Sequence, residues 1–472
     1  MSGLFGQLSS NVNALTAASR SIETAGRNLA NIDNTGYARQ RVVYGNRGTV
    51  QTDLGAQSTG VEAIGIEQLR DSLMDKQVVR ETSTLASYTG EQSAYQRAQA
   101  ALGESISSTS STSSSTSSTT TSGISKAIGN FFNTFQSFAA SPTDAGERQT
   151  LVQYAGVLTD TLNSTDASLT QVQTDLTTQA SSDAASANNL ISQIANLNSQ
   201  IGRFEINAPG SAVDLRDERE AKIEALSKFM SIETQADTDG SGEVSVFTQG
   251  ASGPVQLVNK ANTFGSVAVS GTTVTAGSPA TVLALTGGSI HGALTARDGA
   301  IQDMRDSLSA LSSQLITSVN AAYNPSAAAG GNFFIGTNAS TIRVNTSITP
   351  TSLVSASTGV AGDNDIAKAV AALANKVFST TGAPADAIDG TFSQFYSNSV
   401  TALGQTLSTT NDKVSNQTTI ANLVSSQRDS VSGVSMDEEV TDLVKYQRAF
   451  QASSRVIQII DQLLQTVVSL GT

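Results

Sequence analysis

The side chains that could carry out chemistry in this chain are few and scattered. The only histidine, His291, lies in a glycine-rich stretch, 287–292, and the chain has no cysteine or second histidine to complete a zinc site with it. No serine stands in a nucleophile motif that His291 could serve. Neither a phosphate-binding glycine run nor a His-Glu-x-x-His pair occurs. We therefore expect His291 to be a solvated loop residue before a helix, and the chain not to be an enzyme.

One group of oxygen-bearing side chains has the spacing of a calcium-binding loop, namely Asp237, Asp239, Ser241 and Glu243. Position twelve of that loop is Thr248, so the bidentate glutamate that completes such a site is missing. The flanking residues alternate as strands do, and Asp239-Gly240 is a strong hairpin signal. We expect a plain hairpin here, with no metal and no other cofactor.

Composition excludes several classes of function. The 472 residues include 27 Lys and Arg against 40 Asp and Glu, for a net charge of −13, which argues against a nucleic-acid surface. Charged residues make up 14%, against about 25% in ordinary soluble domains. Uncharged polar groups cost less free energy to desolvate than ions do, so such a surface suits contacts with other subunits. No apolar run is long enough for a membrane span, and we expect no cleavable secretory signal.

Both ends of the chain carry a narrow apolar stripe that repeats every seven residues. The N-terminal stripe is Leu8, Leu15, Ile22 and Leu29, and the C-terminal one is Leu443, Phe450, Ile457 and Leu464, joined by Tyr446, Ile460 and Val467. A seam this thin is typical of a coiled coil rather than of a helix on a broad core. We expect the two terminal helices to pair with each other and with neighbouring copies, and to be largely disordered in the isolated monomer.

The rest of the pattern predicts a mainly α fold with β inserts, arranged as an elongated multidomain rod. A second helix is expected from about residue 66 to 102, and long helices packing side by side between 151 and 204. Residues 107–122 are all Ser or Thr and predict a loop. The expected domains are a coiled-coil helix at 1–35, a helical body at 36–230, 291–325 and 396–435, small β-containing inserts at 231–290 and 326–395, and a coiled-coil helix at 436–472.

The most distinctive local sequences stand next to the two stripes. Residues 28–40, with Asn31, Gly36, Tyr37, Arg39 and Gln40, resemble the N-terminal signature of the bacterial flagellar rod, hook and junction axial proteins. Residues 432–452 resemble the C-terminal signature of that family, through Asp437, Glu438, Glu439, Tyr446 and Gln447. The Tyr37–Gln40 segment and Tyr446 point to the junction members, and residues 214–219, 292–298 and 331–334 agree.

This resemblance implies a structural role at the junction between hook and filament. Its subunits would form a ring-like axial layer with copies of themselves, in contact with the hook protein, a second junction protein and the filament. It also implies secretion, unfolded, through the flagellar type III apparatus, with an export chaperone holding the C-terminal helix. The resemblance implies neither a nucleic-acid partner nor a membrane span.

Three other functions remain open from the sequence. A hook or distal-rod subunit would share both terminal signatures. A Ser/Thr-rich secreted adhesin would use residues 107–122 as its active feature. A peptidoglycan-acting enzyme would need a carboxylate pair or a metal site in the inserts. Glu438 and Glu439 do not supply one, because acidic residues at a helix start favour the positive end of its dipole.

Overall fold

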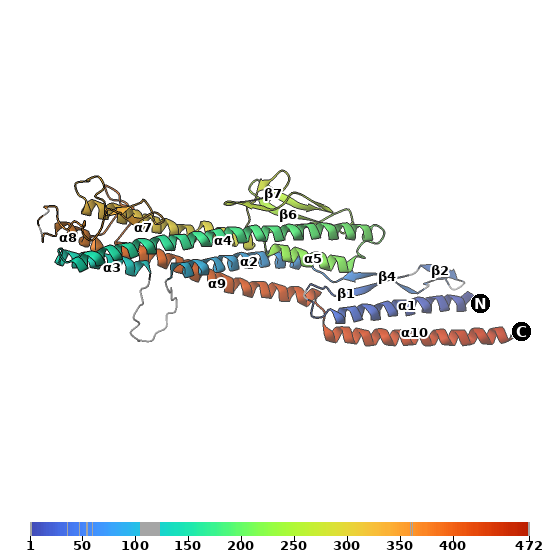
Figure 1. The fold of residues 1–472 in the computed structure, drawn as a ribbon. Helices are drawn as coiled ribbons and strands as arrows, with labels where there is room; N and C mark the ends of the chain where they lie inside the picture. The colour runs from blue at the N-terminus through green and yellow to red at the C-terminus, as the bar shows by residue number, and fades with distance from the viewer. Residues whose placement is uncertain are drawn as a thin grey trace. The chain divides into compact units, whose positions relative to one another are not determined.

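The computed structural model describes residues 2–34, 36–46, 48–52, 55–58, 60–103, 123–358, 360 and 362–470. The expected Ser/Thr loop at 107–122 lies outside these residues. Figure 1 labels the helices and strands of the chain, which divides into two compact units. The first unit consists of residues 1–86, 183–288 and 417–472, and the second of residues 87–182 and 289–416.

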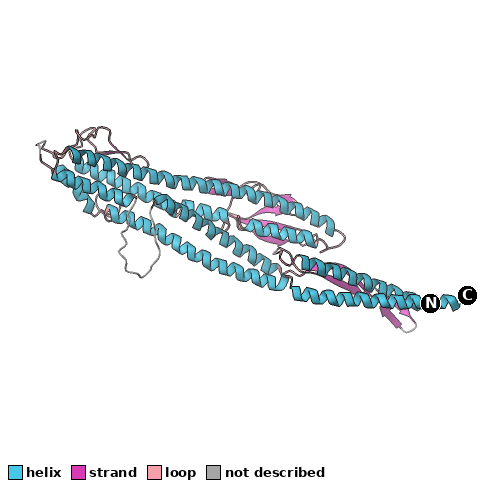
Figure 2. Cartoon of the chain, turned by 60° about the horizontal axis from the view of Figure 1, so that its bottom comes forward, coloured by secondary structure: helices cyan, strands magenta, loops and turns pink. Residues whose placement is uncertain are grey.

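Helices dominate both units, so the expected mainly α class is confirmed (Figure 2). The helices are α1 (Ser2–Ala30), α2 (Ser72–Leu102), α3 (Ile124–Ala140), α4 (Ala145–Glu205), α5 (Val213–Ser227), α6 (Ser289–Asp298), α7 (Ala300–Tyr323), α8 (Asp365–Ala372), the 3-10 turn η1 (Leu373–Asn375), α9 (Phe392–Ser432) and α10 (Met436–Leu470). Among the described residues, no helix is long and apolar enough to cross a bilayer.

The strands form small antiparallel sheets. In the first unit, β1 (Gln40–Asn46) pairs with β4 (Val61–Gln68), and β2 (Thr49–Thr52) with β3 (Gly55–Ser58). A four-stranded sheet has the order β5-β6-β7-β8, with β5 (Glu233–Ala236), β6 (Val244–Gly250), β7 (Gly253–Asn259) and β8 (Asn262–Thr263). The remaining strands are β9 (Ala268–Ser270), β10 (Thr273–Ala276), β11 (Thr281–Val282), β12 (Phe334–Ile335) and β13 (Arg343–Val344). The pairing of β5 with β6 confirms the hairpin expected around Asp239-Gly240.

Within the first unit, α1 lies alongside α10 and also packs on the ribbon formed by β1 and β4 (Figures 1 and 2). Small side chains permit this double contact, because Ala17, Ala18 and Ala25 are buried on α1. The hydroxyl of Ser21 lies 2.5 Å from that of Tyr44 on β1, and Arg20 donates to the carbonyl of Ala63 on β4. The ribbon thus covers one side of α1 and leaves another side for α10.

The second unit has its own aromatic core, which is centred on α3. Phe131, Phe135 and Phe138 are fully buried, at the spacing that places side chains on one helical face. Phe333 packs against Phe131 and Phe135, with ring centroids 6.0 and 5.4 Å away. Such pairs add to the stabilisation that comes from burying the rings.

Three expectations about helices are wrong in detail. The second helix begins at Ser72 rather than near residue 66, because residues 61–68 form β4. Residues 145–205 are one helix, α4, and not several lying side by side. His291 is in the first turn of α6 rather than in a loop; it is half-buried, and burial lowers its pKa.

Candidate assembly site at the terminal helices

The predicted seam residues lie on the two helices that pack together, α1 and α10. Leu8, Leu15, Ile22 and Leu29 are half-buried, as are Leu443, Phe450, Ile457 and Leu464. Ile460 is buried, with 3% of its surface exposed, whereas Val467 near the helix end is 43% exposed. The seam is therefore fully covered at Ile460, half covered along the rest of its length and open at Val467.

A second set of apolar side chains on α10 stays exposed, and we call it the outer stripe: Val440, Val444, Val456, Ile459 and Leu463. Ile459 is 55% exposed and Leu463 49% exposed. The two are four residues apart and therefore lie on one face of the helix. Because Ile459 is exposed and Ile460 is buried, the face that carries Ile459 and Leu463 differs from the buried face of α10.

Arg39 joins the residues that precede β1 to the start of α10. Its Nε donates to Oε1 of Glu439 at 2.6 Å, and its Nη1 to Oε2 of Glu438 at 2.5 Å. Asp442 Oδ2 lies 3.5 Å from Nη2 of the same guanidinium. Asn28 at the end of α1 donates to the other oxygen of Glu439 at 3.0 Å. We call Asn28, Arg39, Glu438, Glu439 and Asp442 the Arg39 cluster; it fixes the base of the helix pair.

Asn28 also holds the turn that leads from α1 to β1. Its side-chain nitrogen donates to the carbonyl of Gln40, and its side-chain oxygen accepts from the amide of Gln40 and from the Tyr37 hydroxyl. Burial, together with the nearby Asp214 and Asp217, raises the pKa of Tyr37 above its usual range. Tyr37 therefore stays a neutral donor to Asn28. Through these hydrogen bonds, motif residues Tyr37 and Gln40 stabilise the turn between α1 and β1.

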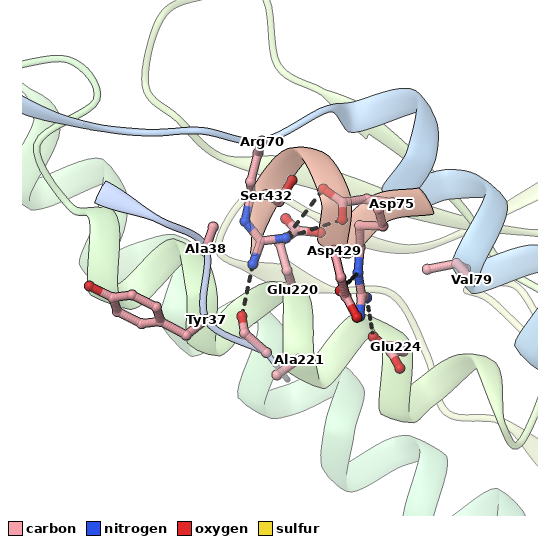
Figure 3. Close-up of a pocket in the computed structure, with 12 residues that line it drawn as sticks. Tyr37, Ala38, Arg70, Asp75, Val79, Glu220, Ala221, Glu224, Asp429 and Ser432 are labelled. Carbon is pink, nitrogen blue, oxygen red and sulfur yellow. Dashed lines mark hydrogen bonds and ion pairs between the residues drawn. The ribbon is translucent and has the colours of Figure 1, made fainter. Parts of the chain in front are cut away.

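A second ionic group connects the same turn to α2 and α5, and Figure 3 shows how Arg70 lies against Asp75 of α2. Arg70 donates to Asp217 at 2.8 Å, to Asp75 at 3.2 Å and to the carbonyl of Gly36 at 2.9 Å. We call Arg70, Asp75 and Asp217 the Arg70 cluster. Burial raises the pKa of Asp217 to about 6 and also raises that of Asp75, despite the neighbouring guanidinium.

The remaining motif residues lie just after α1 or on α10. Asn31 follows α1 and donates to the carbonyl of Arg27. Asp437 is exposed in the first turn of α10, Tyr446 is half-buried and Gln447 is exposed. Glu438, also in the first turn of α10, binds Arg39.

The side chains considered for chemistry, His291 and the acidic hairpin, contact other side chains of the protein. The Nδ1 of His291 lies 2.9 Å from the hydroxyl of Ser87, which is itself buried. Lys260 binds the acidic hairpin, with its Nζ 2.5 Å from Asp239 and 3.2 Å from Asp237. The ammonium group thus pairs with two of the carboxylates of this hairpin.

Sequence reasoning missed Arg70, Asp217 and Asn28 as organising residues. Asp217 lies 147 positions from Arg70, and periodicity carries no information on such pairing. The available signal was local: residues 28–40 and 214–219 both matched the flagellar resemblance.

Two family models match the chain. Residues 110–334 match the model described as flagellar hook-associated protein FlgK helical domain, and residues 425–470 match the flagellar basal body rod FlgEFG protein C-terminal model. Flagellar hook-associated protein 1 of Bacillus subtilis (strain 168) is 24% identical over 509 residues, covering 97% of this chain and 96% of that relative.

Two further likenesses cover about half of the chain. Flagellar hook-associated protein 1 of Salmonella typhimurium is 25% identical over 241 residues, which span 51% of this chain and 40% of the relative. The solved flagellar hook junction protein FlgK from Burkholderia pseudomallei is 23% identical, with a TM-score of 0.47, over 55% of this chain and 46% of that one. On the sequence matches, this chain is similar to flagellar hook-associated protein 1 along nearly its whole length, and to that protein's helical-domain model over residues 110–334.

Proposed function

We propose that this chain is a structural subunit of the bacterial flagellum that joins the hook to the filament and assembles by adding copies of itself along their terminal helices. Its role is mechanical, and it catalyses no reaction. The hook protein contacts one side of a ring-like layer of subunits, and a second junction protein with the filament contacts the other.

The observation that carries the self-assembly is the outer stripe of α10. Packing with α1 leaves Val440, Val444, Val456, Ile459 and Leu463 about half exposed. Fully burying an aliphatic side chain stabilises by about 1.5–3 kcal/mol. A contact that covers the outer stripe would therefore contribute several kcal/mol for each helix. A neighbouring copy presents the same stripe and the same low charge.

The same apolar surface explains why the chain would need protection before assembly. We propose that it leaves the cell unfolded through the flagellar export apparatus, and that a chaperone covers the seam of α10 beforehand. The exposed outer stripe would otherwise join copies prematurely. We also propose for this chain the domain boundaries that the sequence predicts.

Removal of residues 436–472 in the native cell tests the function. We expect hooks to form, filaments not to attach, and filament subunits to appear in the medium. Loss of the hooks themselves would assign the chain to the hook or distal rod instead. Normal swimming would contradict the proposal altogether.

A finer variant separates the outer stripe from the fold. Ile459→Ser with Leu463→Ser should leave the thermal unfolding of the purified chain unchanged and abolish filament attachment. Ile206→Ser is the matched control, because Ile206 is 74% exposed but lies outside the terminal helices. Cells with the control should swim normally.

A further inference from the structure

The first unit has an open groove beside a free strand edge, which neither the terminal helices nor the similarity to flagellar hook-associated protein 1 explains. In the sheet order β5-β6-β7-β8, β5 is an edge strand. Two hollows of about 430 and 460 Å³ adjoin it. Thr234 of β5 and both Lys76 and Val79 of α2 line both hollows. The hollows therefore form one groove, with α2 and β5 contributing to its walls.

The register of β5 leaves backbone groups pointing into this groove. The amide of Asp237 donates to the carbonyl of Glu243 at 3.0 Å, and β5 continues the pairing with Ala236 opposite Val244 and Thr234 opposite Val246. In an antiparallel ladder, bonded and non-bonded pairs alternate. The pairs Ala236–Val244 and Thr234–Val246 are thus the non-bonded ones. The N–H and C=O groups of Ala236 and Thr234 therefore face away from β6. No described residue bonds them.

The groove also has a positive charge to offer. In the hollow of about 430 Å³, the ionisable lining residues are Lys76, Arg80 and Glu233. Arg80 pairs with Glu81, whereas Lys76 is exposed and has neither an ion pair nor a hydrogen bond to any described residue. The acidic residues of the other hollow have arginine partners, namely Arg41 for Glu67, Arg70 for Asp75 and Arg219 for Glu220. Lys76 on α2 and Glu233 on β5 are therefore the charges of that hollow without an ion pair to a described residue, and Lys76 is the cation available to a bound acidic side chain.

Apolar side chains complete the surface. Leu73 on α2 is 63% exposed at the groove, and Val79 is half-buried. A strand laid along β5 would place alternate side chains toward these residues and toward Lys76. Short edge strands usually stay unpaired because a charge or a covering segment protects them. At β5 the residues are exposed, except for half-buried Thr234.

The geometry points to a docking site for an extended acidic peptide segment of a partner protein, which adds to the sheet as a strand beside β5. The N–H and C=O groups of Thr234 and Ala236 bind its backbone. Lys76 binds an acidic side chain, and Leu73 with Val79 contacts an apolar one. Main-chain bonds at a sheet edge give affinity, and alternate side chains give specificity.

The test uses the full chain and a fluorescein-labelled six-residue peptide in which Thr and Asp alternate. Fluorescence anisotropy should show saturable binding with a dissociation constant below about 1 mM, as weak peptide docking requires. Methylation of alternate backbone nitrogens of the peptide should weaken binding at least tenfold, because it removes the donors to β5. Replacing Asp by Lys in the peptide should do the same.

Two proline variants provide the matched comparison. Thr234→Pro removes an outward N–H without breaking the ladder, and proline is tolerated on sheet edges. Thr263→Pro does the same on the opposite edge, since the amide of Phe264 bonds Leu257 and Thr263 is the non-bonded residue between the bonded pairs. We expect Thr234→Pro and Lys76→Gln to weaken binding at least tenfold, and Thr263→Pro to leave it unchanged. Circular dichroism should show both proline variants folded.

Several results would overturn the inference: no binding up to about 1 mM, equal binding of the methylated peptide, or equal losses in the two proline variants. If Thr234→Pro instead changes the sedimentation of the free chain, a second copy occupies the groove and the assignment is wrong. Binding needs only the free chain, so failure would leave the proposed flagellar role untouched.

Discussion

The Nε of Arg39 lies 2.6 Å from Oε1 of Glu439, although the two residues stand 400 positions apart in the chain. Only 3% of the Glu439 side chain is exposed, against 21% for Arg39. A carboxylate this buried costs free energy unless a cation and hydrogen-bond donors satisfy it. The Arg39 cluster thus anchors the first turn of α10 to the end of α1.

Replacement of Arg39 by alanine should loosen that turn. Glu439 would keep Asn28 but lose its cation, at a cost of roughly 1–3 kcal/mol in local opening free energy. Hydrogen exchange of the amides in residues 436–446 should therefore speed up about fivefold or more. Arg41→Ala is the control, since Arg41 and Glu67 are both exposed and 3.5 Å apart. Equal effects of the two variants would contradict the role of the Arg39 cluster.

Asp217 makes the first unit sensitive to pH. Burial raises the pKa of Asp217 to about 6 in the folded chain, above the unfolded value of about 3.9. The folded state therefore holds this proton more tightly, and its stability falls as pH rises from about 4 to about 6. Asp217→Asn removes the titration and can still accept from Arg70 and from the Ala38 amide.

The stability of Asp217→Asn relative to the wild type should accordingly increase between about pH 4 and pH 7, by about 1–3 kcal/mol. Thermal unfolding of both proteins across this range measures it. Asp33→Asn, at an exposed carboxyl, should show no such trend. A difference that stays flat or falls with pH would show that the Arg70 pairing outweighs the burial of Asp217.

Gly292 permits α6 to lie against α2 in the second unit. A Cβ added at Gly292 would overlap the carbonyl oxygen of Ser87, whereas a Cβ at Gly129 in α3 would meet nothing within 4 Å. We expect Gly292→Ala to destabilise by about 1–3 kcal/mol through overpacking. Gly129→Ala should stabilise by roughly 0.5–1 kcal/mol, because alanine favours the helix. Thermal unfolding of both variants checks the pair, and an unchanged melting temperature for Gly292→Ala would refute it.

Two adjacent isoleucines on α10 should have separable effects. Ile460 is buried and Ile459 is 55% exposed. Ile460→Ala should speed hydrogen exchange around residue 460 in the free chain, since removal of a buried isoleucine costs about 2–5 kcal/mol. Ile459→Ala should leave that exchange unchanged but reduce filament attachment. The reverse pattern would mean that the outer stripe is not the contact between copies.

The parts of this fold that follow from local pattern were predictable. The heptad positions place Leu15 and Ile457 on the two helices that pack together, and Asp239-Gly240 joins β5 to β6. Both signals depend on near neighbours in the chain, so no knowledge of the tertiary structure was needed.

The expectations that were wrong or missing concern contacts between residues far apart in the chain. The stretch around Ala180 and Ala184 is rich in Ser and Ala and carries a weak helical signal, yet both alanines are buried and α4 continues through them. Tertiary packing overrides such weak propensities. The partners of Arg39 and Arg70 were likewise invisible, because a charge in a sequence does not specify which opposite charge it meets.

The central claim is that the terminal helices depend on neighbouring copies for much of their stability. Hydrogen exchange of residues 2–30 and 436–470 tests it most directly, in the purified monomer and after incorporation onto isolated hooks. We predict only partial protection of both helices in the monomer, centred on the Arg39 cluster and on Ile460, and strong protection once they are incorporated. Equally strong protection in the free monomer would contradict the account.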